Sequence, residues 1–270
     1  MNPPLSDMVK IHPIDALTVD PARAKQITCV PYDIVSRAES RKLAVNNPLT
    51  LLRVDRADLE FPDSVKFNAP EVYQRAAQNL QRLIQAKALL AEPTPTVFLV
   101  RMIDGNHRQR GFAALADFGD YTSGQLRKHE FTRPDKEDDR VAPIQNLGAL
   151  TGPVLAAYPD HSELTRHMNE IESREKPLAE VTDERGVRHT VWRCPNPAEI
   201  VRLFIQVSRS YIADGHHRAA AAARLAQHRP GPQGILTVYF PASELRVLPY
   251  HRLILKLDPL TIIFFLQHSS

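Results

Sequence analysis

The sequence predicts an α+β fold in which helices flank a mixed sheet. Segments with strand and helix patterns follow one another in mixed order, without the regular βαβ alternation of a parallel α/β protein. The 270 residues are 43% hydrophobic and 24% charged, a composition typical of globular proteins. A chain of this length can bury a sizeable core.

The first half of the chain contains one clear helix and one clear hairpin. Apolar residues recur every three or four positions over residues 71–90, after Pro70, which predicts an amphipathic helix. Residues 96–103 and 110–117 predict two strands, and Asp104-Gly105 between them favours a hairpin turn. Weaker patterns predict short strand-like pieces at 11–17 and 30–35, a helix at 37–45 and a strand at 51–55.

The second half alternates between helices and strands after a charged segment at 126–140. The patterns predict helices at 162–174, 196–207 and 216–227, and strands at 189–193, 210–213 and 234–240. Alanine-rich residues 219–223 are especially strong helix formers.

The net charge and the two cysteines indicate which partners and which cellular compartment to expect. The net charge is only +3 and the basic residues are scattered, so a nucleic-acid partner is not favoured. Cys29 and Cys194 form neither a disulfide framework nor a C-x-x-C metal pair, which indicates a reducing compartment. The N-terminus does not resemble a signal peptide, and the apolar run at 262–266 is far shorter than the roughly 20 residues of a membrane span. We therefore expect a cytoplasmic protein with no membrane partner.

The segment Tyr211-Ile-Ala-Asp-Gly-His-His-Arg218 is the strongest candidate for a functional site. It predicts a strand that turns into a helix, and the first amides of a helix form a natural anion site. Gly215 lets the backbone approach a ligand, Arg218 can donate two hydrogen bonds to a phosphate, and His216 and His217 add further donors. Asp214 also suits a helix N-cap. In the purely structural alternative, the segment is only a capped turn.

The charged run is the second candidate. Residues 127–140 contain five basic and five acidic side chains, which is typical of a solvated surface with local ion pairs. His129 and Glu130 would suit a general base or a metal ligand if they folded toward the helix start. No H-E-x-x-H zinc motif is present.

The third candidate is the segment 30–34, Val-Pro-Tyr-Asp-Ile, for which a turn with a buried tyrosine is the default interpretation. The chain has no Walker, dinucleotide-binding or G-x-S-x-G motif, so the common nucleotide folds and α/β-hydrolases are excluded.

Several stretches together resemble the family catalogued as domain of unknown function 1015, over about residues 10–258. They are Ile11-His-Pro-Ile-Asp-Ala-Leu17, Val30-Pro-Tyr-Asp33, Lys128-His-Glu-Phe-Thr-Arg-Pro-Asp-Lys-Glu-Asp-Asp-Arg140, Tyr211 to Arg218 and Leu245-Arg-Val-Leu-Pro-Tyr-His-Arg252. Members of that family are usually longer. The resemblance therefore implies that residues 259–270 are an aberrant or truncated tail.

The Asp-Gly-His-His-Arg turn is also similar to the ParB/sulfiredoxin-like fold, in which a strand leads into a helix start that holds nucleotide phosphates. This resemblance implies an N-terminal α+β region at 1–120 and a ParB/sulfiredoxin-like nucleotide-binding region at 121–258. Free-serine kinases of that group carry an Asp-Gly-His-x-Arg turn and an upstream His-Glu. The matching positions here are His129-Glu130 and Asp214 to Arg218.

Three functions follow from these resemblances. The first is a nucleotide-dependent phosphotransferase acting on a small hydroxyl substrate, with free L-serine as one candidate. Gly215, His216, His217 and Arg218 would hold ATP or ADP, Glu130 with His129 would serve as the base, and Asp214 would help to hold Mg²⁺. The alternatives are a ParB-like nucleotide-binding regulatory or DNA-associated protein, and a phosphate-ester hydrolase. The sequence leaves the oligomeric state open.

Overall fold

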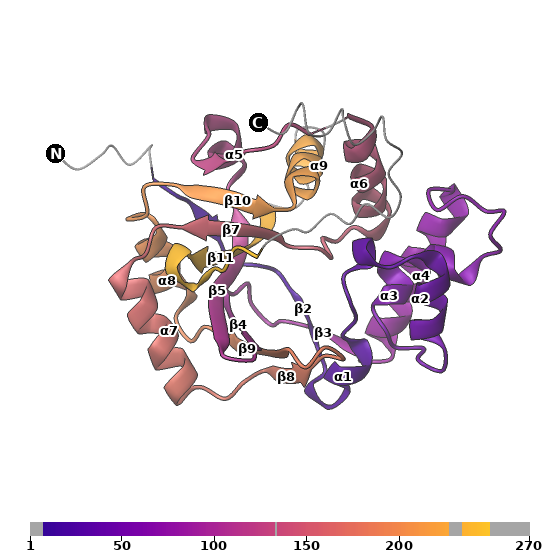
Figure 1. Ribbon diagram of the computed structural model, residues 1–270, viewed down its shortest axis with the longest axis horizontal. Helices are drawn as coiled ribbons and strands as arrows, with labels where there is room; N and C mark the ends of the chain where they lie inside the picture. The colour runs from indigo at the N-terminus through magenta and orange to yellow at the C-terminus, as the bar shows by residue number, and fades with distance from the viewer. Residues whose placement is uncertain (1–7, 133, 227–233, 249–270) are drawn as a thin grey trace, which may run out of the picture.

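A mixed sheet of nine strands lies at the centre of the molecule, with helices on both of its sides (Figure 1). The computed structural model describes residues 8–132, 134–226 and 234–248. The predicted α+β class, with a mixed sheet and flanking helices, is confirmed. Residues 259–270 lie outside the described part of the chain.

The main sheet has the strand order β6-β10-β7-β11-β5-β4-β9-β8, and β1 pairs with the end of β5. The pairs β6–β10 and β7–β11 are parallel, and the others are antiparallel. The strands are β1 (Ile11–His12), β4 (Phe98–Asp104), β5 (His107–Ala116), β6 (Leu126–Arg127), β7 (Val154–Tyr158), β8 (Ala179–Thr182), β9 (Arg188–Arg193), β10 (Ser210–Asp214) and β11 (Ile235–Pro241). A separate pair joins β2 (Leu17–Val19) to β3 (Leu89–Ala91). Strands from both sides of residue 120 therefore share one sheet.

The β4–β5 hairpin forms where the sequence predicts it. Asp104 pairs with His107 across the turn, and Gly105 adopts the left-handed conformation that this turn needs (φ 55°). Strand β5 lies in the middle of the sheet, and its residues 110–116 are all buried.

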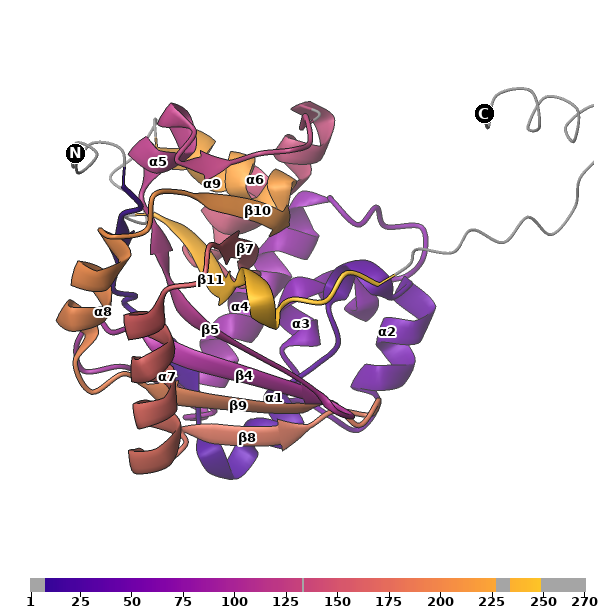
Figure 2. The same ribbon diagram turned by 60° about the vertical axis from the view of Figure 1, so that its left-hand side comes forward.

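Helices α7 (Ser162–Arg174) and α8 (Pro197–Phe204) cover one side of the sheet (Figure 2). Leu164 and Met168 recur at a helical spacing on α7 and are fully buried. The Phe204 ring of α8 packs against the rings of Phe112, Tyr158 and Tyr239 on three strands. This aromatic cluster fixes α8 on the sheet, and Leu164 and Met168 of α7 pack into the same apolar core.

Helices α9 (His216–Ala226) and α6 (Pro134–Leu147) lie side by side at one end of the sheet (Figures 1 and 2). The alanines at 219–223 are buried, and their small side chains let α9 pack closely against its neighbours. Next to α6 lies α4 (Pro70–Gln85), and Leu147 at the end of α6 packs into the same apolar cluster as Leu80 and Leu83 of α4.

The N-terminal region also contains several short helices. They are η2 (Pro21–Arg23), α1 (Ala24–Ile27), η3 (Tyr32–Ile34), α2 (Arg37–Ala44), α3 (Leu52–Asp55) and η4 (Ala57–Glu60). Of these, α3 and η4 pack against α4. Helix α2 starts with a capping box, in which the Glu39 amide donates to the Ser36 hydroxyl and the Glu39 carboxylate accepts from the Ser36 amide. Two further short helices are α5 (Phe118–Ser123) and η5 (Ala242–Glu244).

Three sequence predictions need correction. The segment predicted as a strand at 51–55 instead forms helix α3 (Leu52–Asp55), because the Thr50 hydroxyl accepts the Leu52 amide and starts a helical turn. The expected strand at 30–35 is instead the turn η3, which follows Pro31. The long helix ends at Gln85 and not near residue 90, because Lys87 takes a positive φ (53°) and the chain continues into β3.

Candidate functional site

The turn between β10 and α9 has the predicted form of a strand that leads into a helix. Gly215 adopts φ 95°, a conformation that favours glycine. A Cβ atom there would lie 3.3 Å from the Val154 Cα and 3.3 Å from the Arg218 side chain. The Ala219 amide bonds the Gly215 carbonyl and closes the first helical turn. The amides of residues 216–218 therefore have no acceptor within the helix.

This helix start borders a cavity of about 690 Å³, a size typical of small-molecule sites. His217 and Arg218 line it from α9, Asp139 and Arg140 from α6, and Asp55 from α3. Residues of α4, β11 and the segment 150–152 complete the wall. The cavity therefore lies between the N-terminal helices and the α6–α9 end of the sheet.

Arg218 lies at the junction of the turn and the cavity. One guanidinium nitrogen donates to the Asp214 carboxylate at 2.6 Å, and another donates to the Pro153 carbonyl. The guanidinium carries five N–H groups, so these two bonds leave others for a ligand. Gly152 makes room for this side chain, since a Cβ on Gly152 would lie 3.2 Å from the Arg218 Cδ.

Tyr32 and Arg140 face the same cavity. The Arg140 guanidinium lies over the Tyr32 ring, 4.7 Å from its centroid. Burial raises the pKa of the Tyr32 hydroxyl, against the lowering effect of Arg140 and Arg218. The segment 30–34 thus forms the turn of its default interpretation rather than a strand-like piece, and its tyrosine is half-buried in the cavity wall rather than fully buried.

A second cluster joins His129, Glu130 and His216 at the other face of the turn. The His216 side chain is buried, and its Nδ1 lies 3.6 Å from Glu130 Oε2. The His129 amide donates to His216 Nε2 at 3.4 Å, and the two rings meet edge to face at 4.4 Å. Burial and the neighbouring His129 lower the pKa of His216, so its imidazole is neutral at pH 7. The fold thus brings the predicted His-Glu pair to the helix start.

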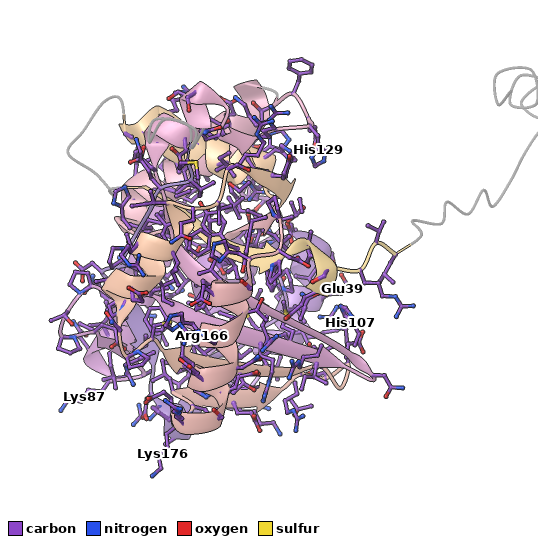
Figure 3. The ribbon with its side chains drawn as sticks, turned by 90° about the vertical axis from the view of Figure 1, so that its left-hand side faces the viewer. Glu39, Lys87, His107, His129, Arg166 and Lys176 are labelled. Atoms are coloured by element: carbon purple, nitrogen blue, oxygen red, sulfur yellow. The ribbon has the colours of Figure 1, made fainter. Side chains whose placement is uncertain are left out.

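These two clusters divide the predicted site. His217 and Arg218 line the cavity, whereas His129, Glu130 and His216 are not part of its wall. His129 is exposed near the edge of the molecule (Figure 3), and Glu130 is 59% exposed. Asp214 is exposed and paired with Arg218.

The family of the chain follows from its match over residues 11–270 to the family described as "Protein of unknown function (DUF1015)". The chain belongs to this family. Neither the comparison with curated proteins nor that with solved structures gives a match. No helix in the described part of this DUF1015 protein has the length and apolar character needed to cross a membrane.

Asp55 is the cavity residue of this DUF1015 protein that sequence reasoning missed. Burial raises the pKa of its carboxyl group to about 6, although a hydrogen bond from Thr151 and the charge of Arg140 act in the opposite direction. Its neighbour Asp58 behaves differently. Burial also opposes ionisation of Asp58, but hydrogen bonds from Arg56 and Arg37 outweigh it and lower the pKa. The sequence pattern at 51–55 predicts only a strand. It does not mark Asp55 as a site residue, because the contacts of Asp55 come from residues distant in the sequence.

The metal-ligating side chains of the described residues do not gather into a cluster of three or more. Asp214 offers a single carboxylate, and one of its oxygens accepts from Arg218. Mg²⁺ is commonly held by one or two carboxylates together with substrate phosphates. Asp214 therefore fits an ion that arrives with a nucleotide better than a resident metal.

Neither cysteine is suited to nucleophilic chemistry. Burial raises the pKa of Cys29 to about 12, with a further contribution from the nearby Asp55. Burial alone raises the pKa of Cys194 to about 12. The thiolate is the reactive form of cysteine, so both side chains are inert near neutral pH.

Proposed function

We propose that this protein is a cytoplasmic, nucleotide-dependent phosphotransferase that acts on a small hydroxyl substrate, with free L-serine as one candidate acceptor. We also propose that the region around β10 and α9 is the ParB/sulfiredoxin-like core that the sequence suggests. The observation that carries the proposal is the start of α9 on the wall of the 690 Å³ cavity, with His217 and Arg218 directed to it.

The helix start supplies what a phosphate group requires. The amides at 216–218, which have no acceptor within the helix, and the positive end of the α9 dipole favour an anion. His217 also offers a buried Nδ1 that has no partner among the described residues. Arg218 adds guanidinium donors beside this turn. Together these groups would hold the phosphates of ATP or ADP, and Mg²⁺ would reduce their charge with Asp214 as one ligand.

The opposite wall of the cavity is suited to the remainder of the nucleotide and to the small acceptor. Tyr32, Tyr73 and Phe67 provide aromatic surface, and Arg140 adds a cation over the Tyr32 ring. A cavity of this volume can hold a nucleotide and a small acceptor together. Phosphoryl transfer depends mainly on positioning and electrostatic stabilisation, which these groups offer.

Calorimetric titration with ADP and ATP, with and without Mg²⁺, tests the phosphate site. We expect Arg218→Ala to weaken nucleotide binding roughly tenfold or more, because a charge-assisted pair contributes roughly 1.5–3 kcal/mol. Arg202→Ala is the matched control, since Arg202 pairs with Glu199 on α8, on the other side of the sheet. Equal affinity of Arg218→Ala and the wild-type protein would contradict the assignment of the phosphate site.

Transfer is tested separately with terminally labelled nucleotide and a panel of small alcohols that includes L-serine. We expect label to appear in a phosphate ester of one acceptor. Label found only in inorganic phosphate would favour a hydrolase. Binding without any turnover would favour a regulatory nucleotide-binding protein.

A further inference from the structure

Asp55 differs in its surroundings from Asp58, another acidic residue that lines the cavity. The Thr151 hydroxyl donates to its carboxylate, and the charged or titratable groups that face it are Arg140 of α6 together with Cys29 and Tyr32 of the segment before α2. Asp55 forms no ion pair with any residue in the described part of the chain, whereas Asp58 is 2.9 Å from both Arg37 and Arg56. Asp55 is therefore available to a ligand in a way that Asp58 is not.

A short path connects Asp55 to the proposed phosphate site. Thr151, its hydrogen-bond partner, precedes Gly152. The Cβ position of Gly152 lies 3.2 Å from the Arg218 Cδ and 3.8 Å from a Tyr32 ring carbon. The carboxylate and the guanidinium thus border neighbouring parts of one cavity. An acceptor held at Asp55 would lie beside a phosphoryl group held at the start of α9.

We propose that Asp55 and Thr151 form the acceptor subsite of this cavity, which binds a small alcohol, and that the Asp55 carboxylate takes the proton of the attacking hydroxyl. This inference rests on the proposed phosphotransferase function and assigns its base. The acceptor oxygen forms a bond to the terminal phosphorus of a nucleoside di- or triphosphate. The bond from that phosphorus to the bridging oxygen breaks, the shortened nucleotide leaves, and the acceptor proton moves to Asp55.

The geometry favours Asp55 over Glu130 for this role. Glu130 is exposed, contacts His216 and lies outside the cavity wall. Asp55 lines the cavity. Burial raises the pKa of Asp55 to about 6, and a base whose pKa lies near the working pH is ionised yet accepts a proton effectively.

The kinetic test compares wild-type protein with Asp55→Asn, which keeps the size of the side chain. The substrates are ATP or ADP with Mg²⁺ and the panel of alcohols, and the readout is release of the shortened nucleotide, which reports transfer to alcohol and to water alike. We expect kcat to fall by about 10²–10⁴-fold, the usual contribution of a positioned base. Nucleotide affinity should stay within about threefold. Asp63→Asn is the matched control, because Asp63 lines the same cavity, is 80% exposed and pairs with Arg41.

The pH profile provides a readout that a structural role would not change. We expect wild-type kcat/KM to fall below about pH 6 as Asp55 takes up a proton, and this limb to vanish from the residual activity of Asp55→Asn. Wild-type turnover by Asp55→Asn would overturn the assignment and leave the phosphotransferase intact. Loss of turnover in Glu130→Gln but not in Asp55→Asn would likewise overturn the assignment of Asp55 and leave the phosphotransferase intact. Absence of nucleotide binding and turnover in the wild-type protein would overturn both proposals.

Discussion

Asp55 and Asp58 lie three residues apart on one cavity wall, and the structure shifts their acidities in opposite directions. Both carboxyl groups are shielded from water by burial, and burial disfavours their charged forms. Hydrogen bonds and charge from Arg37 and Arg56 offset this effect of burial on Asp58. Asp55 has only the Thr151 hydroxyl and the more distant charge of Arg140. A carboxylate that is kept ionised at a cost in stability is characteristic of functional sites.

The pH dependence of stability should reveal this cost. The pKa of Asp55 is about 6 in the folded protein and about 3.9 in an unfolded chain. Its contribution to stability is therefore complete below about pH 4 and is lost as the pH rises through 6. Because asparagine cannot ionise, we expect Asp55→Asn to melt at a higher temperature than the wild-type protein at pH 8. The difference should shrink as the pH falls toward 5.

Asp58→Asn is the matched comparison for this experiment. The pKa of Asp58 is lowered, so its stabilising effect is present at neutral pH and is lost in acid. We expect this variant to melt below the wild-type protein at pH 8. Thermal unfolding followed by circular dichroism from pH 5 to 8 measures both variants. A lower melting temperature of Asp55→Asn at pH 8 would show that the ionised Asp55 stabilises the fold.

Residues close in sequence could be predicted to act together, and residues joined only by the fold could not. The Asp-Gly-His-His-Arg turn could be recognised in the sequence as a candidate site, because its glycine, histidines and arginine are consecutive. Asp55, Thr151 and Arg140 come from three distant segments, and only their packing brings them to one cavity. The residue types of His129 and Glu130 in the charged run indicate a candidate base, but their contact with His216 required the structure.

At the scale of elements, periodicity predicted some of the longer helices, but it missed the 14-residue helix α6, which lies in the charged segment and the loop predicted after it. Helix α7 begins and ends at the expected residues, because Leu164, Met168 and Ile171 recur at a helical spacing within a segment of 13 residues. Helix α3 has four residues, too few for a period to separate a helix from a strand. The local hydrogen bond of Thr50 decides its conformation, and a pattern of hydrophobicity does not record that bond.

Helix α7 also carries two glutamates with very different expected effects on stability. Glu172 bonds both Arg101 and Arg110, and the Arg110 side chain is only 4% exposed. Glu163 pairs with Arg166 on the helix surface, where both side chains are 49% exposed. We expect Glu172→Ala to lower the free energy of unfolding by about 3 kcal/mol, because it leaves a buried arginine without one of its partners.

Urea unfolding of the two variants tests this difference. Glu163→Ala should leave the midpoint near that of the wild-type protein, since exposed pairs are screened by water and salt. Similar midpoints for both variants would show that Glu244 and Asn169, the other partners of Arg110, compensate for the loss of Glu172.

At the scale of the whole molecule, the cavity is lined by both of the regions that the sequence predicts, the one before and the one after residue 120. Its walls come from α3 and α4 on one side and from α6, α9 and β11 on the other. The two predicted regions, before and after residue 120, also share the main sheet, where β5 pairs with β11. A ligand in this cavity therefore contacts both regions at once, and its binding energy stabilises their association.

This arrangement predicts a specific pattern of hydrogen exchange on nucleotide binding. We expect slower exchange in α3, in α6 and at the start of α9 together, because the ligand bridges them and binding to the folded state suppresses local opening. The β8–β9 edge lies at the far end of the sheet from β6 and β10 (Figure 1), and its exchange should not change. Arg218→Ala should lose the protection on both walls at the same nucleotide concentration. Protection confined to α9 would mean that the phosphate turn binds anions without engaging the N-terminal helices, and the cavity would then not be the site of the reaction.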